Sequence, residues 1–483
     1  MLTRRRFVGY SALSSSALIC PPLLRSAFGQ TTSPSGERPV RLAILGSTYR
    51  RGSNLQIIAD RFLTGYPYQG DWHMPNVKVV SVYVDERIRK ATAAANEFQL
   101  ALSGQTRRQP QSPTQPASGA KRTPDERWEP MAPSSEEQGL LSDLSPARAQ
   151  QFGFRLCHNI PEALRGGGDK IAIDAVLAVV EQCDEYPYPA NSKGQVLLPR
   201  YDFFQQCVQV FETEKYSVPY FNHKQLSFSF VEAQSMVKTA EHLKFPLMAG
   251  SSMPVTWRLP DIDVPHNAHV QEAVMVGVGK LDDMDFDALE AMQCMLERRQ
   301  GGETGVKAVQ LLEGDDVWSA GQAGRWSKDL LTSALSRSDT PLGLTLLDGR
   351  NQDLVGDGVL PQLVKDPAAY CIEYLDGTKA TLLMLNGAIK DFNIAARLVD
   401  QNTVSTQFFM PPAPNETYSA CLTAKIDQMY QTRTALYPVQ RTLLTTGLLE
   451  ACLSSRHHLN QRLETPQLAI SYQAPIESQY IRT

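Results

Sequence analysis

The sequence predicts an α/β protein: a Rossmann-like, doubly wound parallel sheet, followed by a C-terminal α+β domain with an open, largely antiparallel sheet. Between residues 40 and 250, short and wholly apolar runs alternate with amphipathic stretches, the pattern of parallel strands and the helices that cover them. After residue 250 the apolar runs acquire period-two features and helices become fewer. The length of 483 residues suits two such domains.

In the first domain, expected at 38–250, each apolar run ends near a glycine, a proline or a polar residue. The strands are expected at 41–46, 77–85, 171–180, 218–222 and 245–250. The helices are expected at 54–64, from 86 to about 100, from 162, at 203–214 and at 230–244. Such alternation buries the strands on both faces. Residues 103–145 interrupt it with Gln, Pro, Ser, Arg and Glu, a composition that predicts a disordered insertion.

The second domain, expected at 251–475, is predicted to carry the substrate or to form an oligomer. Strands are expected at 274–277 and 370–386, the latter turning as a hairpin at Asp376 and Gly377. Helices are expected at 285–298, 326–335 and 442–456. Its open sheet is expected to supply the substrate face or the interface of a homo-oligomer.

Composition excludes several classes of protein. A net charge of -4 argues against sequence-independent nucleic-acid binding, which needs clustered Lys and Arg. Eight cysteines without a C-x-x-C pair give neither a disulfide scaffold nor zinc-ribbon spacing, so no metal site is predicted. The cysteines outside the N-terminal segment lie mostly among apolar residues, which is typical of buried small hydrophobic residues.

The N-terminus has the features of an export signal. Arg4, Arg5 and Arg6 precede Phe7, a short apolar stretch follows, and small residues end it at Gly29. Adjacent arginines before an apolar stretch are typical of the twin-arginine route. We therefore expect residues 1–29 to be a twin-arginine signal peptide, with a periplasmic protein and no stable membrane span after cleavage. The alternative is a basic N-terminus that is retained.

Several segments resemble the Gfo/Idh/MocA family of nicotinamide-dependent oxidoreductases, and within it an exported subgroup of predicted dehydrogenases. The resemblance runs from about Pro39 to Tyr472, apart from the insertion. It is carried by LAILG (42–46), SVYVD (81–85), VPYFNHKQLS (218–227), FPLMAGSSMPVTWR (245–258), ERRQGGETGV (297–306) and YPVQRTLLTTGLLEA (437–451). It implies NAD or NADP as cofactor and a small, sugar-like substrate.

The first loop is the candidate for the cofactor's pyrophosphate. A dinucleotide fold has G-x-G-x-x-G between strand and helix. Here Gly46 and Gly52 are present, whereas Thr48 replaces the middle glycine. Amides at the start of the next helix still favour an anion, and Arg50 can add a contact. The alternative is an empty loop with surface arginines.

Two acids follow strands at the same edge of the predicted sheet. Asp85 ends the second strand, where the family places the acid that accepts the ribose hydroxyls, and a carboxylate there favours NAD over the 2′-phosphorylated cofactor. It lies farther from Gly46 than the usual spacing of about 20 residues. Alternatively, Asp85 only caps the following helix. Glu181 follows the strand that ends at Val180 and is expected to border the cofactor.

The family's Glu-Lys-Pro segment aligns with His223-Lys224-Gln225, so the lysine is kept while both flanks differ. By the resemblance, Lys224 lies beside the nicotinamide and the reacting oxygen of the substrate. A lysine there can polarise a carbonyl, or accept an alcohol proton if burial lowers its pKa. The alternative is a solvated lysine at a strand end.

The family's Asp-x-x-x-His motif aligns with Asp283 and Asp287, which puts a carboxylate where the histidine is expected. A carboxylate can act as general base if its pKa is raised toward neutrality. Alternatively, the acids of this segment complement the dipole of a helix or hold a metal ion through oxygen atoms. Trp257 and Arg258, after the last parallel strand, are candidates for holding the substrate.

Three functions are consistent with these residues. The first is an exported NAD(P)-dependent oxidoreductase of a carbohydrate or polyol, with a tightly bound cofactor, in which Lys224 and an acid of the 283–287 segment manage the proton. The second, favoured by Thr48, His223 and Asp287, is a non-catalytic protein that binds a ligand on the same fold with a degenerate nucleotide site. The third is a lyase or hydrolase that uses transient redox at one sugar carbon.

Overall fold

A computed structural model describes residues 38–90, 143–183, 187–344, 349–399, 402–411 and 416–482. Residues Pro39–Thr483 form one compact unit. The predicted signal segment lies outside the described residues. So does the predicted insertion, except for its last three residues, of which Ser145 already begins helix α3 (Ser145–Phe152).

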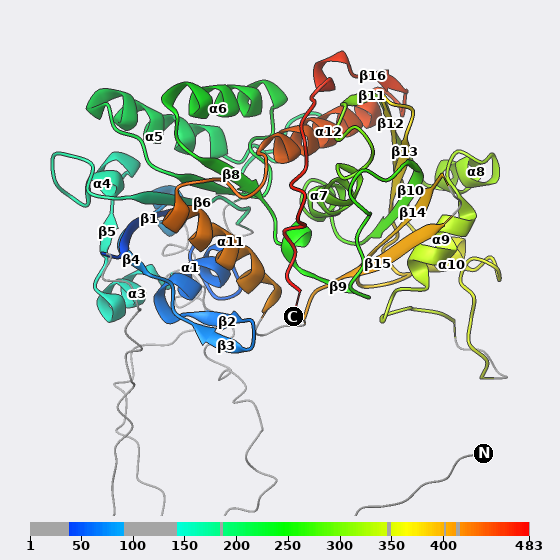
Figure 1. Ribbon diagram of the computed structural model, residues 1–483, viewed down its shortest axis with the longest axis horizontal. Coiled ribbons are helices and arrows are strands. Elements are labelled where there is room, and N and C mark those ends of the chain that lie inside the picture. The colour runs from blue at the N-terminus through cyan, green and yellow to red at the C-terminus, as the bar shows by residue number, and fades with distance from the viewer. Residues whose placement is uncertain are drawn as a thin grey trace, which may run out of the picture. The chain divides into compact units, whose positions relative to one another are not determined.

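The first sheet has six parallel strands in the order β5-β4-β1-β6-β7-β8 (Figure 1). The strands are β1 (Val40–Gly46), β4 (Val77–Val84), β5 (Arg155–Cys157), β6 (Ala175–Val179), β7 (Tyr220–His223) and β8 (Leu247–Gly250). The order reverses between β1 and β6, which is the point where doubly wound folds bind ligands. A small ribbon, β2 (Tyr66–Tyr68) with β3 (Asp71–His73), lies between α1 and β4. The predicted parallel sheet is confirmed.

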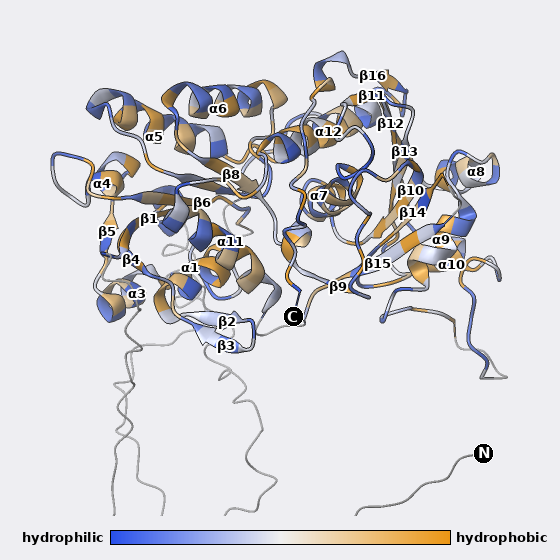
Figure 2. Cartoon of the chain, in the orientation of Figure 1, coloured by the Kyte–Doolittle hydropathy of each residue, from blue (hydrophilic) through white to orange (hydrophobic). Residues whose placement is uncertain are grey.

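Helices cover both faces of this sheet. One face packs against α4 (Ile160–Arg165), α5 (Arg200–Glu214) and α6 (Phe230–Leu243). The other packs against α1 (Asn54–Thr64) and α11 (Tyr418–Thr432), which lie side by side and present hydrophobic residues to each other (Figure 2). The side chain of Ser53 caps α1 by accepting from the Gln56 amide, an ordinary start signal for a helix.

Helix α11 is an addition from late in the chain that the sequence did not predict. Its residues are buried on nearly every side, so it lacks the single apolar stripe by which helices are recognised. Tyr430 donates a hydrogen bond to the Val176 carbonyl over 2.8 Å, which ties this helix to β6. The first sheet is therefore completed by residues far from it in sequence.

One strand is shorter than predicted. The apolar run from residue 171 predicts a strand to 180, whereas β6 covers only Ala175–Val179. Asp174 accepts hydrogen bonds from the Arg41 amide at 3.0 Å and from Arg41 Nε at 2.9 Å. The Asp174 amide also donates to the Arg41 carbonyl over 2.7 Å, so Asp174 is tied to β1 by side-chain and backbone bonds just before the regular strand begins.

The second sheet has eight strands in the order β16-β11-β12-β13-β10-β14-β15-β9. The strands are β9 (Trp257–Leu259), β10 (Val270–Gly277), β11 (Val306–Glu313), β12 (Ala368–Tyr374), β13 (Lys379–Met384), β14 (Phe392–Leu398), β15 (Thr403–Phe409) and β16 (Leu463–Glu464). All neighbouring pairs are antiparallel except β10 with β13. The predicted fold class is thus confirmed, including the hairpin at Asp376 and Gly377.

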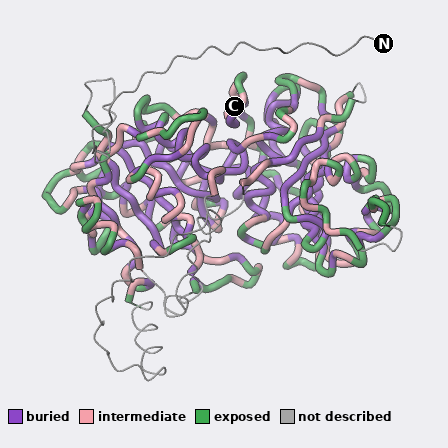
Figure 3. Tube along the Cα trace, turned by 90° about the horizontal axis from the view of Figure 1, so that it is seen from below, coloured by how far each residue is buried: buried purple, intermediate pink, exposed green. Residues whose placement is uncertain are grey.

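Helices also cover both faces of the second sheet. The face toward the first sheet packs against α7 (Met284–Leu296) and α12 (Gln440–His457). The other face packs against α8 (Asp315–Gln322), α9 (Lys328–Leu335) and α10 (Leu360–Leu363). The face expected to be free for a substrate or a second copy is therefore covered by the chain's own helices. Figure 3 shows buried segments filling both sheets and exposed segments around them.

All seven cysteines beyond the predicted signal segment lie among the described residues and are buried, as expected of small hydrophobic residues. In the described part of the chain, no helix combines the length and apolar character needed to cross a membrane.

Candidate functional site

The carboxyl ends of β1, β6, β7 and β8 bring four loops to one edge of the first sheet. Helix α7, on the second sheet, begins beside this edge. The Ser251 amide, directly after β8, donates to Glu290 Oε2 of α7 over 2.6 Å. The candidate site lies where these loops meet the first turns of α7.

Lys224 lies at the centre of this region. It follows β7 and adopts a left-handed backbone with a φ of 62°, which is uncommon for a residue with a side chain. A hydrogen bond from its amide to the Gly250 carbonyl, 3.0 Å long, holds this conformation. Its Nζ lies 2.5 Å from Asp283 Oδ1 and 3.1 Å from Asp287 Oδ2. The three predicted catalytic residues are therefore in direct contact.

The two carboxylates around Lys224 differ in their surroundings. The side chain of Asp283 is 58% exposed, whereas that of Asp287 is 8% exposed. Although burial acts to raise the pKa of Asp283, the Lys224 ammonium lowers it below the usual range. Burial raises the pKa of Asp287 to about 6, against the opposing effect of Lys224. Asp287 Oδ1 is buried and has no hydrogen-bond partner among the described residues.

The same carboxylates keep Lys224 protonated. Burial acts to lower the pKa of Lys224, but the charges of Asp287 and Asp283 raise it above the ordinary value. The sequence left two roles open for Lys224: an ammonium that polarises an oxygen, or a neutral amine that accepts a proton. The raised pKa favours the ammonium.

A second ring of ionisable groups surrounds this cluster. Burial lowers the pKa of Arg200 to about 10, and its Nε and Nη1 have no partner among the described residues. Burial raises the pKa of Asp282 to about 7, and this carboxylate accepts a hydrogen bond from the Val196 amide. Asp285 turns away from Lys224 and accepts from the Tyr370 hydroxyl over 2.7 Å. In the described part of the chain no group of three or more metal-binding side chains is placed to hold an ion.

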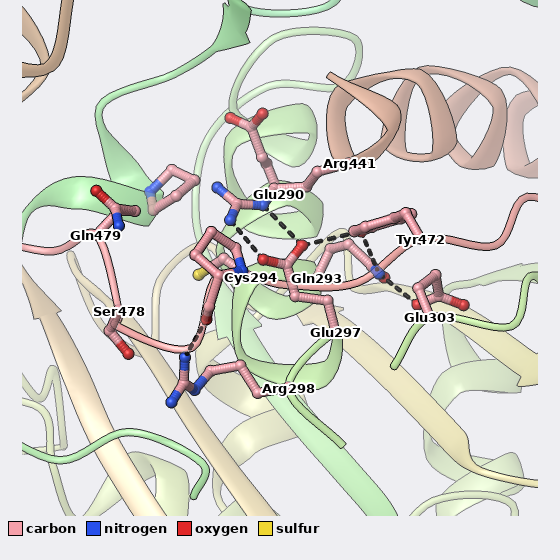
Figure 4. A network of polar contacts seen from close by, with 12 residues as sticks. Glu290, Gln293, Cys294, Glu297, Arg298, Glu303, Arg441, Tyr472, Ser478 and Gln479 are labelled. Atoms are coloured by element: carbon pink, nitrogen blue, oxygen red, sulfur yellow. Dashed lines mark hydrogen bonds and ion pairs between the residues drawn. The ribbon is translucent and has the colours of Figure 1, made fainter. Parts of the chain in front are cut away.

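Glu290 extends the polar contacts along α7. It accepts from the Ser251 amide and from Thr442 Oγ1 at 2.9 Å, and burial raises its pKa to about 7. Two turns farther, at the end of α7, Glu297 binds Arg441 and the Tyr472 hydroxyl in a buried network (Figure 4). This face of α7 is therefore polar although it lies inside the protein.

The predicted phosphate loop is closely packed. A side chain on Gly46 would lie 2.3 Å from Leu55 Cδ2, so the glycine lets α1 pack against β1. Thr48 is buried, whereas Gly52 is exposed with a φ of 77°. The amide of Arg50 donates to Ser53 Oγ over 3.3 Å.

The carboxylate of Glu181, a residue of the loop after β6, contacts the first residues of α1. Its Oε2 accepts from the Asn54 amide at 3.0 Å and from Asn54 Nδ2 at 2.9 Å, and its Oε1 accepts from the Leu55 amide at 3.0 Å. Burial raises the pKa of Glu181, while these donors act to lower it. The residue predicted to border the cofactor thus occupies the helix amides at which phosphates bind.

Asp85 is held by its neighbours on the chain. Arg87 Nη2 lies 2.7 Å from Asp85 Oδ2, and the Tyr188 hydroxyl donates to the same oxygen over 3.0 Å. Its Oδ1 accepts from the Arg87 amide, so Asp85 also caps the following turn, as the alternative interpretation expected. A cavity of about 570 Å³ borders this carboxylate, between the end of β4 and the first turns of α5.

The two predicted substrate residues lie on the second sheet. Arg258 is buried, with its guanidinium 3.9 Å from the ring centre of Phe408, and donates to the carbonyls of Met253 and Pro254. Trp257, half-buried, packs against the core beside α11. β9 belongs to the second sheet, and the contacts of Arg258 lie within the core beside that sheet.

Two residues at the site, Arg200 and Ser251, carry no recognisable signal in the sequence and join it only through tertiary contacts. Glu290 belongs to the acidic segment that the sequence singled out, but its partners Ser251 and Thr442 were not foreseen. Asn54 did carry a signal, since it is the first residue of a predicted helix and its amide was expected to favour an anion.

Comparison with protein-family models and with curated proteins finds no match. Solved structures do match. The structure of GenD2 from gentamicin A biosynthesis in complex with NAD is similar at a TM-score of 0.50 and 12% identity, covering 90% of this chain and 99% of that one. Myo-inositol 2-dehydrogenase from Lactobacillus plantarum has a TM-score of 0.46 and 11% identity, covering 88% of this chain and 99% of that one. A myo-inositol dehydrogenase from Corynebacterium glutamicum has a TM-score of 0.43 and 9% identity, covering 88% of this chain and 98% of that one. The likeness to GenD2 shows a shared fold over nearly the whole of both chains.

Proposed function

We propose that this chain, which has the fold of the Gfo/Idh/MocA oxidoreductases, is an NAD(P)-dependent oxidoreductase of a carbohydrate or polyol. The observation that carries the proposal is the Lys224 ammonium between two carboxylates, one of which, Asp287, has a buried oxygen with no hydrogen-bond partner in the described part of the chain. Oxidation of an alcohol is helped by a base whose pKa lies near neutrality and by a positive charge beside the oxygen that loses its proton. Asp287 and Lys224 fit these two roles.

Each residue has one task in this reaction. The chemistry that the nicotinamide supplies when bound is acceptance or donation of a hydride. Asp287 Oδ1 takes the hydroxyl proton of the substrate during oxidation and returns it during reduction. Lys224 stays protonated, donates a hydrogen bond to the substrate oxygen, and stabilises the negative charge that develops on that oxygen. Asp283 holds the ammonium in position from the exposed side.

The chain offers two features that fit a dinucleotide. We assign the cavity of about 570 Å³ beside Asp85 to the adenosine of the cofactor, whose ribose hydroxyls would take the place of Arg87 or Tyr188 on that carboxylate. The Asn54 and Leu55 amides already hold an anion, the carboxylate of Glu181, which stands where a phosphate would bind. GenD2, of the same fold, is described in complex with NAD.

The substrate class follows from the side chains around Lys224. They are charged or hydrogen-bonding groups, mainly Asp282, Asp283, Asp287 and Arg200, with donors and acceptors in close alternation. A ligand rich in hydroxyl groups can satisfy both kinds of partner, whereas an apolar ligand would leave them unpaired. This supports a small, polyhydroxylated substrate.

The test begins with the purified, folded protein. It is denatured, and released nicotinamide is measured by absorbance and mass; separately, NADH formation is followed with a panel of inositols, sugars and sugar alcohols. We expect bound or added cofactor and turnover with at least one polyol. A protein that releases no nicotinamide, gains no thermal stability from millimolar NAD or NADP, and turns over nothing would contradict the proposal.

A second candidate is a ligand-binding protein with a closed nucleotide site. It is favoured by Glu181, which occupies the α1 amides, and by Tyr188, which takes up one oxygen of Asp85. In that case a sugar should stabilise the protein against heat while NAD and NADP have no effect. Thermal melting with NAD or NADP and with sugars, together with the turnover assay, therefore separates the two candidates.

We also propose that the protein is exported by the twin-arginine route to the periplasm. The support is the sequence of residues 1–29 alone. Replacing Arg4 and Arg5 by Lys should leave the protein uncleaved inside the cell, which fractionation and N-terminal mass analysis can check. Unchanged export of this variant would contradict the route.

A further inference from the structure

We propose that Glu181 is an internal substitute for the cofactor phosphate, and that its carboxylate moves from the start of α1 to Arg200 when the dinucleotide binds. This inference rests on the proposed function and adds to it the residues that exchange. The phosphate would bind the amides of Asn54 and Leu55 together with Asn54 Nδ2.

The first argument is the set of donors that Glu181 uses. Three N–H groups converge on its two oxygens within 3.0 Å, and all three belong to the first two residues of α1. Helix amides at this position have no partner within the helix and attract phosphate and carboxylate alike. A carboxylate and a phosphate cannot occupy them together, so one must leave before the other binds.

The second argument is that only the side chain of Glu181 needs to move. Its backbone is fixed to the loop after β1, because Ser47 Oγ donates to the Glu181 carbonyl at 2.8 Å and accepts from the Glu181 amide at 2.9 Å. The carboxylate can therefore change partner while β1 and β6 stay joined. Rotation about side-chain bonds is faster than any rearrangement of the sheet.

The third argument is the presence of a second partner. Arg200 is 3% exposed, and its Nε and Nη1 have no hydrogen-bond partner among the described residues. Burial lowers the pKa of Arg200, and the charges of Asp282, Asp283 and Glu181 act to raise it, so Arg200 belongs to the same buried group of charges. A guanidinium offers two parallel N–H groups that match a carboxylate. The bond to Arg200 would offset the loss of the amides.

The exchange has a measurable consequence. While Glu181 occupies the amides, only a fraction of the molecules can bind the cofactor, and the observed affinity falls by that fraction. Removing the carboxylate should therefore tighten binding, whereas removing most binding-site residues weakens it. This opposite sign distinguishes an internal competitor from an ordinary contact.

The experiment measures the Kd of NAD and of ADP by calorimetry for the full chain and for Glu181→Ala. We expect both ligands to bind at least about tenfold more tightly to the variant, which corresponds to a competent fraction of one tenth or less in the parent protein. ADP carries the two phosphates without nicotinamide, so its binding does not depend on the redox reaction.

Two further variants serve as controls. Glu214 also accepts from a backbone amide, that of Ile171, and from an arginine, Arg165, but lies at the end of α5 away from Lys224. Glu214→Ala should leave both Kd values unchanged. Arg200→Gln should weaken NAD binding in the parent protein and have no effect on it in the Glu181→Ala background, because the exchange no longer occurs there. Thermal melting shows that each variant is folded.

Equal Kd values for the parent and Glu181→Ala would overturn the exchange but leave the proposed oxidoreductase intact, as would weaker binding by the variant. If no variant binds NAD, NADP or ADP at millimolar concentration, the exchange and the proposed function both fail. These outcomes are distinguishable because the first requires measurable binding by the parent protein.

Discussion

The ammonium of Lys224 lies 3.1 Å from Oδ2 of Asp287, while Oδ1 of the same carboxylate is buried and has no partner among the described residues. One oxygen is thus fixed by the charge of the lysine, and the hydrogen-bonding capacity of the other is unused among the described residues. The relationship links the end of β7 in the first sheet to the first turn of α7 on the second.

The first prediction concerns Lys224. Lys224→Met removes the only cation shown in contact with Asp283 and Asp287 among the described residues, and with it the stabilisation of charge on the substrate oxygen. We expect kcat to fall roughly 10²–10³-fold, the range typical of the loss of one donor that stabilises negative charge in the transition state. Steady-state kinetics with the best substrate measure this. Lys238→Met, on the outer surface of α6, should retain full activity. An unchanged rate for Lys224→Met would remove this lysine from the mechanism.

The second prediction is the pH dependence of kcat. Oxidation needs Asp287 as a carboxylate, and burial raises its pKa to about 6. The rate of oxidation should therefore rise with pH up to about 6 and become constant above it, whereas reduction, which needs the acid form, should fall over the same interval. Asp287→Asn should abolish both inflections and most of the activity. Asp315→Asn, at the start of α8, is the matched control.

The third prediction is the pH dependence of stability caused by Glu290. Burial raises the pKa of Glu290 to about 7, so the folded protein holds this proton more tightly than the unfolded chain does. The stabilisation that comes from this tighter proton binding is complete below a pH of about 4.3, where Glu290 is protonated in both states, and it is lost as the pH rises through about 7. As the pH rises from 4 to 8, the free energy of unfolding of Glu290→Gln should increase by up to about 3 kcal/mol relative to that of the parent protein.

Urea unfolding of both proteins at several pH values measures this difference. Glu212→Gln, on the exposed side of α5, should follow the parent protein at each pH. If Glu290→Gln and the parent lose stability in parallel, Glu290 is not the group responsible.

The fourth prediction concerns the buried pair of Arg441, in α12, and Glu297, at the end of α7. Arg441 Nε lies 2.8 Å from Glu297 Oε2, and the Tyr472 hydroxyl donates to the same oxygen over 2.9 Å (Figure 4). Arg441→Met leaves Glu297 charged and buried without its cation, which typically costs about 3–5 kcal/mol. Arg462→Met breaks a surface pair with Glu373 and should cost less than about 1 kcal/mol. Comparable losses in the two variants would contradict this contrast.

Much of the fold could be predicted because its signals are local. The apolar run before Gly46, the Ser53 cap and the alternation up to Gly250 each depend on neighbouring residues only. Helix α11 was missed because it is buried on nearly all sides, so that its residues show no single apolar stripe. The early start predicted for β6 was wrong because Asp174 binds Arg41, a partner 133 residues away.

For the site, the sequence by itself determined which chemical groups are present and which strand ends carry them: Lys224 after β7, Glu181 after β6, and the acids at the start of α7. Only the tertiary structure decided what each group does. It placed Glu181 on the α1 amides, turned Arg258 into the second sheet, and buried Asp287 against Lys224. The physical reason is that pKa values and ion pairs depend on burial and on distances between charges from separate elements, and neither quantity follows from the order of residues along one strand or helix.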